Sequence, residues 1–393
     1  MSATHRQLWS LDDETIFVNH GSFGACPIAV LEAQSRWRQQ LEAQPMAFFL
    51  RQLRPALDAA RETLASFVGA PAEQVVFVPN TTIGVSTILN VTSLAAGDEL
   101  LSTNHAYRAC KVALRRFAER AGARSVEVEV PFPLRGGPAE IVERVVDATS
   151  ERTRLALLDH VTSPTGIVMP IAELVAELTA RGIDVIVDGA HAPGMVPLDI
   201  AAIAPAYYVG NCHKWLCSPK GAGFIYARED RLGELWPLPV SYAGDGLAGV
   251  ERLQDAFAWT GTADPTAYLC VAEAISFLGG LLPGGWPELM ETNRRLALQA
   301  RDLLCNRLAI DSPLPDPMIG ALVALPLPAG EGQVDPRTGQ DQLYQRLQSE
   351  WAIEAPVIPF PAPPQRLLRI SCQLYNELDH YGQIAQALAQ MLS

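Results

Sequence analysis

The chain has 393 residues, of which 49% are hydrophobic, and its 30 Lys and Arg against 43 Asp and Glu give a formal net charge of -13. This length and apolar content suffice for one large and one smaller domain, each with a buried core. Because the acidic residues are scattered and no Lys/Arg-rich run occurs, neither nucleic acid nor an anionic membrane is expected as a partner.

Cysteine usage and the first residues point to a compartment. The odd count of seven cysteines, without CxxC pairs, predicts reduced thiols and neither a disulfide framework nor a structural metal. The segment MSATHRQLWSLDDETIF has no apolar core of signal-peptide length, and no later run of about 18 apolar residues occurs. We therefore expect a cytoplasmic protein without a membrane span.

Short apolar segments alternate with segments of helical period over the first half of the chain. Strands are expected at VVFV (75–78), ELLS (near 100), SVEVEV (125–130), RLALLDH (154–160), IDVIVDG (183–189) and AYYVGN (206–211). AYRACKVALRRFAERAG and IAELVAELTARG have the length and period of helices. Such alternation predicts an α/β fold with a mainly parallel sheet, whose functional groups gather at the carboxyl ends of the strands.

A Gly- and Pro-rich segment, GGLLPGGWPE (279–288), precedes the helical pattern TNRRLALQARDLLCNRLA and predicts a domain boundary. We expect a large domain over 26–285, a small α+β domain over 286–393, and an N-terminal segment, 1–25, that contributes to the cleft and the small domain. The small domain is expected to hold strands near 320–325 and 366–371, the Pro-rich loop PVIPFPAPPQ (356–365), and a closing helix from about Glu377.

The stretch VVFVPNTTIGVSTIL (75–89) predicts a strand that ends in a polar turn and restarts as a helix. Such a junction points unpaired backbone amides outward, where an anion can bind. Asp188 ends an apolar strand, and Lys214 comes after the next strand, 26 residues later. If these strands are neighbours, the two side chains face one cleft.

An amine, a buried carboxylate and an anion site fit one ligand, pyridoxal 5'-phosphate. The amine forms a Schiff base with the aldehyde, the carboxylate keeps the ring nitrogen protonated, and the helix amides bind the phosphate. GAGF (221–224) precedes a strand instead of a helix, so a nicotinamide cofactor is not expected.

Five motifs, VNHGSFGACP, HVTSPTG, DGAHAPG, HKWL and WTGTADPTAYL, carry a family resemblance. From about Asn19 to Asn376 the sequence resembles the class V aminotransferase family of fold type I pyridoxal-phosphate enzymes, and most of all its isopenicillin N epimerase-like branch. The resemblance implies a PLP-dependent transferase (aspartate aminotransferase-like) fold with a seven-stranded, mainly parallel sheet and a small α+β C-terminal domain.

The resemblance also implies roles for single residues. Lys214 would be the Schiff-base lysine, Asp188 the partner of the pyridinium nitrogen, and His105 the residue stacked on the ring. Further cofactor contacts are implied for Thr81, Thr82, Ser163, His191, Asn211, His213 and Thr262. Among these, Thr262 would reach the phosphate of the neighbouring subunit, which implies a homodimer with shared active sites.

Substrate contacts are implied in the same way. Arg369 in LLRISCQLYN would clamp an α-carboxylate, a role that suits its planar fork of donors, while Asn19 and His20 would lie at the cleft mouth. The implied substrate is an α-amino acid whose Cα proton is removed, with Lys214 as the proton carrier.

The reaction after loss of the proton stays open between epimerisation, transamination and β-elimination. Epimerisation needs a second proton donor, for which His20 is a candidate. A cysteine- or cystine-type carbon–sulfur lyase without a persulfide cysteine is the alternative, since PVIPFPAPPQ contains no Cys. A non-catalytic scaffold on the same fold is a third interpretation, against which the intact Lys214, Asp188 and Arg369 argue.

Overall fold

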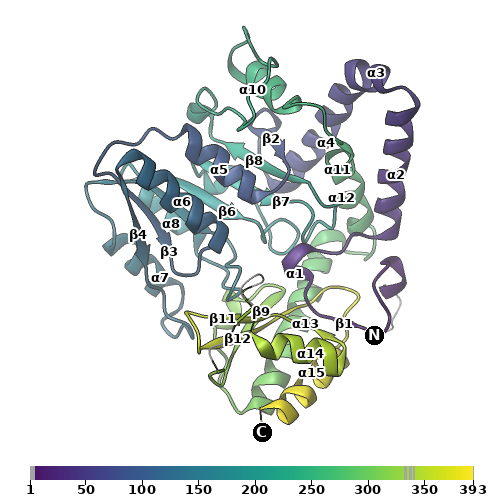
Figure 1. The fold of residues 1–393 in the computed structure, drawn as a ribbon, viewed down its shortest axis with the longest axis vertical. Coiled ribbons are helices and arrows are strands. Elements are labelled where there is room, and N and C mark those ends of the chain that lie inside the picture. The colour runs from purple at the N-terminus through teal and green to yellow at the C-terminus, as the bar shows by residue number, and fades with distance from the viewer. Residues whose placement is uncertain (1–4, 332–333, 336–338, 340, 393) are drawn as a thin grey trace.

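A computed structural model describes residues 5–331, 334–335, 339 and 341–392. Its main sheet has seven strands in the order β2-β8-β7-β6-β5-β3-β4 (Figure 1). The strands are β2 (Val75–Val78), β3 (Glu99–Thr103), β4 (Arg124–Val128), β5 (Thr153–Asp159), β6 (Asp184–Gly189), β7 (Tyr207–Asn211) and β8 (Gly223–Ala227). The strand β8 runs in the direction opposite to the other six, and the pairs among β3 to β7 are parallel, which confirms the predicted mainly parallel sheet and all six predicted strands.

Helices cover both faces of this sheet. The helices of this part of the chain are α1 (His20–Phe23), α2 (Ile28–Ala43), α3 (Pro45–Ala47), α4 (Leu53–Val68), α5 (Thr81–Val91), α6 (Arg108–Ala121), α7 (Gly137–Asp147), α8 (Ile171–Thr179), α9 (Ile200–Ile203), α10 (Gly249–Ala258), α11 (Thr266–Leu269) and α12 (Val271–Gly279). Successive strand residues enter different cores: Leu157 and Ile186 join the core under α5 and α6, whereas Leu158 and Val187 join the core under α8. Both faces are therefore buried, which explains the continuous apolar strands.

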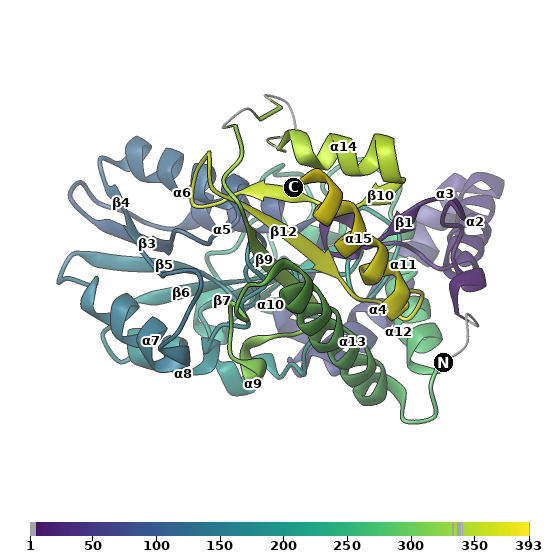
Figure 2. The same cartoon turned by 90° about the horizontal axis from the view of Figure 1, so that it is seen from below.

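The C-terminal part forms a second, smaller layer. It contains α13 (Gly285–Leu308), β9 (Leu322–Leu327), α14 (Gln342–Trp351), β10 (Ile353–Glu354), β11 (Val357–Pro359), β12 (Arg366–Ser371) and α15 (Leu378–Met391). The strands β11, β12 and β9 make an antiparallel sheet, against which α13 and α15 pack (Figure 2). The N-terminal β1 (Ile16–Phe17) pairs in parallel with β10. The predicted domain limits at residues 25 and 285 stay a prediction.

One segment differs from its prediction. The stretch 356–365 was expected to be a loop, but its residues 357–359 form β11 and pair with β12. β11 lies at the edge of its sheet, where a proline costs no ladder hydrogen bond, so the proline content did not exclude a strand.

Two predicted absences can be compared with the described part of the chain. No helix described there is long and apolar enough to cross a bilayer. All seven cysteines lie in the described ranges, and each is a buried free thiol. The polar residues at the carboxyl ends of the parallel strands lie together, on the side of the sheet that faces the C-terminal layer.

Candidate active site

Lys214 and Asp188 lie at the same sheet edge. Strands β6 and β7 pair in parallel, with Asp188 beside Val209, and Lys214 comes after the end of β7. Each side chain acts electrostatically on the other: burial raises the pKa of Asp188, and the Lys214 charge partly offsets that increase. The sequence interpretation required these two strands to be neighbours, and they are.

The Lys214 amine is held by a histidine. Its Nζ lies 3.1 Å from Nε2 of His191, whose Nδ1 accepts a hydrogen bond of 3.3 Å from the Trp215 indole. Since an indole only donates, Nδ1 carries no proton and the neutral imidazole has its hydrogen on Nε2. Burial, aided by the Arg369 charge, lowers the pKa of Lys214 to about 8. The amine can therefore accept from His191 as a free base, which is its nucleophilic form.

Asp188 is 2% exposed and has a donor on each oxygen. Its Oδ1 accepts from the Ala190 amide at 3.0 Å, and its Oδ2 accepts from the Cys110 thiol at 3.3 Å. These donors favour the ionised carboxylate in a site that water does not reach. Asp188 can therefore hold a proton on a heterocyclic nitrogen.

The first turn of α5 has features of an anion site, and it is joined to Asn211 at the end of β7, three residues before Lys214. Asn80 caps the helix by accepting from the Ile83 amide at 3.0 Å, and the Thr81 amide donates to Oδ1 of Asn211 at 3.0 Å. In the described structure the buried Thr81 hydroxyl oxygen has no hydrogen-bond partner. An orphaned hydroxyl at a helix N-terminus is suited to a phosphate.

The remaining predicted phosphate contacts differ in how deeply they are buried. Thr82 is partly buried in the same turn, and Nδ1 of His213 donates to the Ala222 carbonyl at 3.0 Å, which leaves Nε2 for another partner. Thr262 is exposed in the loop between α10 and α11. Of the predicted set, Thr262 is thus the one directed at solvent in this chain.

A glycine lets the N-terminal segment approach the backbone at His213, next to Lys214. Gly24 has a φ of +70°, and a Cβ built on it would lie 2.0 Å from the His213 carbonyl oxygen. A side chain at this position would displace the backbone beside Lys214. The GSFG motif therefore has a steric reason for its second glycine.

His105 is fixed through both ring nitrogens. Its Nδ1 lies 2.7 Å from the Thr165 hydroxyl and its Nε2 lies 2.8 Å from the Val130 carbonyl, so Nε2 donates and Nδ1 accepts. Burial lowers the pKa of His105 to about 4, so the ring is neutral. A flat, immobile, uncharged ring is suitable for stacking on a cofactor.

Arg369 on β12 reaches the site from the C-terminal layer. Its Nη1 donates to the Ser163 carbonyl at 2.7 Å, and its Nη2 donates to the Ser22 hydroxyl at 2.7 Å and to Asn19 Oδ1 at 3.4 Å. Its Nε is buried without a partner, and within the described residues no carboxylate forms an ion pair with it. Burial lowers the pKa of Arg369 to about 10, which leaves it charged at neutral pH.

His20 lies elsewhere than the predicted cleft mouth. The side chain is fully buried; its Nε2 donates to the Lys214 carbonyl at 3.0 Å and its Nδ1 accepts from the Tyr375 hydroxyl at 2.8 Å. Burial lowers the pKa of His20 to about 3. In this position His20 supports the backbone of Lys214, and both of its nitrogens are occupied.

Sequence reasoning missed several contributors. Ser22, which binds Arg369, belongs to the quoted GSFG motif, so its signal was present but unassigned. Cys110 and Tyr375 gave no signal, because a helix period or a strand end does not show which residue a thiol or phenol will contact. Trp215 comes directly after Lys214 and fixes the His191 tautomer.

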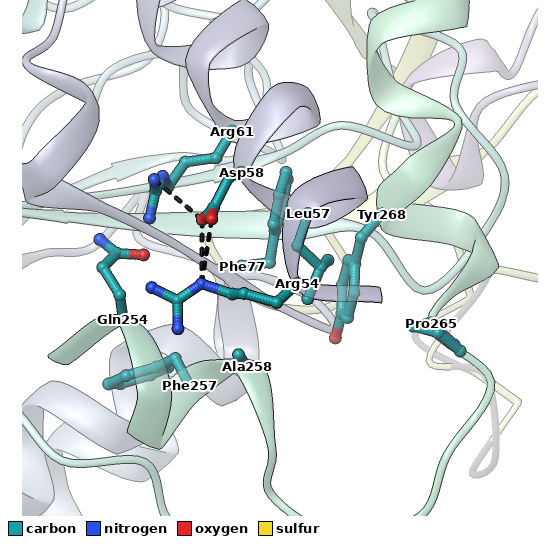
Figure 3. Close-up of a pocket in the computed structure, with 10 residues that line it drawn as sticks. All are labelled: Arg54, Leu57, Asp58, Arg61, Phe77, Gln254, Phe257, Ala258, Pro265 and Tyr268. Carbon is teal, nitrogen blue, oxygen red and sulfur yellow. Dashed lines mark hydrogen bonds and ion pairs between the residues drawn. The ribbon is translucent and has the colours of Figure 1, made fainter. Parts of the chain in front are cut away.

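A separate pocket between α4, β2 and α10 has a different electrostatic character (Figure 3). Its Arg54 is paired with Asp58 at 3.1 Å and also with Asp255, and Arg61 is paired with Asp58 at 3.0 Å. Its cations therefore already have carboxylate partners, unlike Arg369. None of the predicted site residues lines this pocket.

Comparison with known proteins shows the family of this chain. Residues 25–282 match the Aminotransferase class-V family model. The chain belongs to the class V aminotransferase family. It is 35% identical to isopenicillin N epimerase of Streptomyces clavuligerus, over 96% of this chain and 95% of that protein, and 30% identical to putative L-cysteine desulfhydrase 1 of Oryza sativa subsp. japonica, over 96% and 83%.

Solved structures show the same fold. A complex between the cystine C-S lyase C-DES and its reaction product cysteine persulfide superposes with a TM-score of 0.78 at 21% identity, covering 96% of this chain and 98% of that chain. The resemblance predicted from the motifs is thus confirmed. As a family enzyme, the protein uses pyridoxal phosphate.

The residues present fit this cofactor. Lys214 offers an amine whose lowered pKa makes the free base more accessible to the aldehyde, and Asp188 offers a buried carboxylate for the ring nitrogen. The orphaned Thr81 hydroxyl at the start of α5 offers an unused donor for the phosphate. An amine, an acid and an anion site within one sheet edge match the three functional groups of the molecule.

Proposed function

We propose that this enzyme inverts an α-amino acid at Cα: it removes the Cα proton from one face and a proton that originates from solvent is added to the other, an epimerisation like that named for its relative from Streptomyces clavuligerus. The observation that carries the choice of an α-amino acid as substrate is Arg369, a buried residue with an unpaired Nε and no carboxylate partner among the described residues, and the 35% identity to isopenicillin N epimerase supports inversion. Because a buried cation is costly unless it is paired, the site favours an anionic group of the substrate.

The chain's own residues would each take one part of this work. Pyridoxal phosphate, when bound, takes up the electron pair that Cα retains as its proton leaves. Arg369 fixes the carboxylate and so orients Cα, and Lys214 is the base that takes the proton. Asp188 keeps the ring nitrogen protonated, while His191 holds the Lys214 amine and His105 holds the ring plane.

Carbon–sulfur lysis is the second candidate, because relatives about 30% identical over nearly the whole chain are named as L-cysteine desulfhydrases. This reaction begins with the same proton loss at Cα. It needs no persulfide cysteine, which agrees with the burial of all seven thiols in the described ranges. Burial raises the pKa of Cys372, next to the C-terminal strand, to about 12, so this thiol is a poor nucleophile.

The proposal includes a homodimer. Thr262 is exposed, so a phosphate contact through this residue has to be made in a neighbouring copy. Exposed apolar side chains on the same chain, among them Phe23 at 74% and Tyr242 at 76%, support a covered surface in the assembly. Sedimentation should give a dimer mass, and Thr262→Ala should weaken cofactor binding without dissociating the dimer.

The deciding experiment is incubation of the loaded enzyme with a panel of L- and D-amino acids in deuterium oxide. Deuterium at Cα with loss of optical purity identifies an epimerase, sulfide with pyruvate identifies a lyase, and a keto acid identifies a transaminase. The matching amines, which lack the carboxylate, serve as controls and should not exchange. If no amino acid gains deuterium or is consumed while the cofactor is bound, the proposed function is wrong.

A further inference from the structure

A second carboxyl group lies beside Asp188 and has no role in the mechanism above. Asp159 ends β5, and its Cα is the register partner of Asp188 on β6. Register partners on adjacent parallel strands are about 4.8 Å apart and point to the same face of the sheet. Asp159 is 3% exposed and Asp188 is 2% exposed, so this carboxyl pair is shielded from water.

Two ionised carboxylates on adjacent register positions are strongly disfavoured when both are shielded from water. The donors in the described structure are unevenly shared between the pair. Asp188 has the Ala190 amide, the Cys110 thiol and the Lys214 charge, whereas Oδ2 of Asp159 is buried without any hydrogen-bond partner. Because this oxygen has neither a hydrogen-bond donor nor water to stabilise a negative charge, it is the favoured position for a carboxyl proton.

The surrounding charges point the same way. Burial raises the pKa of Asp159 well above its usual range, and the Asp188 charge adds to the increase. From α6 and the segment before it, the Tyr107 amide and the more distant Lys111 charge oppose this effect only in part. The neighbouring His160 is neutral, since burial lowers its pKa to about 4, and its Nδ1 pairs with the Tyr208 hydroxyl at 2.9 Å.

We propose that Asp159 is a positioning residue that stays protonated and shares its proton with Asp188. A carboxylate that accepts this additional hydrogen bond is a weaker base. Asp159 therefore sets how firmly Asp188 holds the proton on the cofactor ring nitrogen, and with it the electron demand on Cα. The inference concerns the same site and rests on the proposed function, but its test is made on the holoenzyme without any amino acid.

The first measurement is the infrared difference spectrum of the wild-type holoenzyme minus Asp159→Asn at neutral pH. Asparagine keeps the shape and a neutral donor, so this variant should fold and bind cofactor like the wild type. We expect one band of a protonated carboxyl group, present in the wild type and absent from Asp159→Asn. If the difference spectrum shows only an ionised carboxylate, Asp159 carries no proton and the proposal is overturned.

The second measurement is the chemical shift of the cofactor ring nitrogen, labelled with nitrogen-15. Asp159→Asn should match the wild type, whereas Asp159→Ala should move the signal toward the protonated form, as if the pKa of the ring nitrogen had risen by about one unit. The same shift in all three proteins would overturn the link to the ring, and a shift away from the protonated form in Asp159→Asn would mean that Asp159 is ionised. Should Asp159→Ala not fold, Asp159→Leu, which keeps about the same size and also removes the donor, takes its place. A null result in the amino-acid panel leaves these spectra unaffected, so the two failures are distinguishable.

Discussion

Replacing Arg369 by Gln should lower activity and leave the fold at least as stable as before. The guanidinium is 5% exposed, and a pKa lowered to about 10 corresponds to roughly 3 kcal/mol of cost for keeping it charged in the folded protein. Loss of its hydrogen bonds to the Ser163 carbonyl and the Ser22 hydroxyl costs about 1 kcal/mol each. The net effect on the apoenzyme is therefore about 0 to 2 kcal/mol of added stability.

The same substitution removes the group that binds the substrate carboxylate. A truncated buried charge pair typically costs about 2 to 5 kcal/mol, so kcat/KM should fall by a factor of about 30 to 5,000. Urea unfolding of the apoenzyme measures the first effect, and steady-state kinetics on the best amino acid of the panel measure the second. Opposite signs of the two effects are the signature of a residue kept for binding.

Arg301 on α13 is a matched control. It is also 5% exposed, but it is paired with Asp302 at 2.7 Å and with Asp316. Arg301→Gln should therefore cost about 1 to 2 kcal/mol of stability and leave KM unchanged. If Arg369→Gln behaved like this control, losing stability and retaining kcat/KM, the inference of a carboxylate site from an unpaired guanidinium would be refuted.

Three further outcomes are expected. Lys214→Ala should fold and bind the cofactor only reversibly, so that borohydride links no cofactor to the protein, and turnover should fall by about 10² to 10⁴. The control Lys220→Ala should retain both the covalent cofactor and the turnover. Since the pKa of Lys214 is lowered to about 8, its amine is protonated below that pH. The rate at which the apoenzyme attaches the cofactor covalently, followed by absorbance, should therefore rise with pH to a midpoint near 8. A midpoint near 10 would contradict the argument that burial lowers this pKa. Gly24→Ala should cost about 2 to 3 kcal/mol in urea unfolding, because its Cβ would meet the His213 carbonyl, while Gly97→Ala, with φ +89° and open space around it, should cost only about 1 kcal/mol. Equal losses in the two glycine variants would rule out the steric explanation.

The fold could be predicted because its main signal is local. Each parallel strand is an apolar run whose alternate residues enter two different cores, as Leu157 and Leu158 do. Such a run can be recognised in the sequence without knowing which strands lie beside it. The strand at 357–359 was missed, because a high proline content disfavours a strand inside a sheet but does not exclude one at its edge.

The prediction of the site went as far as charge at strand ends allows. Asp188 and Lys214 were expected to share one cleft because a carboxylate after an apolar run needs a partner; the pairing of β6 with β7 agrees with this, and their roles stay predictions. Asp159 ends its strand in the same way and was passed over, although its register with Asp188 can be derived from the parallel order once the sheet is known. His20 was placed at the cleft mouth because its motif lines the cleft, but the direction of a side chain within a short turn depends on Tyr375, 355 residues away.

The charge of Arg369 also explains how one lysine can serve first as a nucleophile and then as a base. The Arg369 charge is the second largest cause, after burial, of the lowered pKa of Lys214, so in the free site more of the amine is neutral and nucleophilic than in an ordinary lysine. A substrate carboxylate on Arg369 would cancel that charge. The pKa of Lys214 would then rise toward its ordinary value, and the amine would become a stronger base when the proton at Cα has to be removed. On this argument Arg369 does more than orient the substrate, because the presence of the carboxylate changes the proton affinity of the group that performs the chemistry.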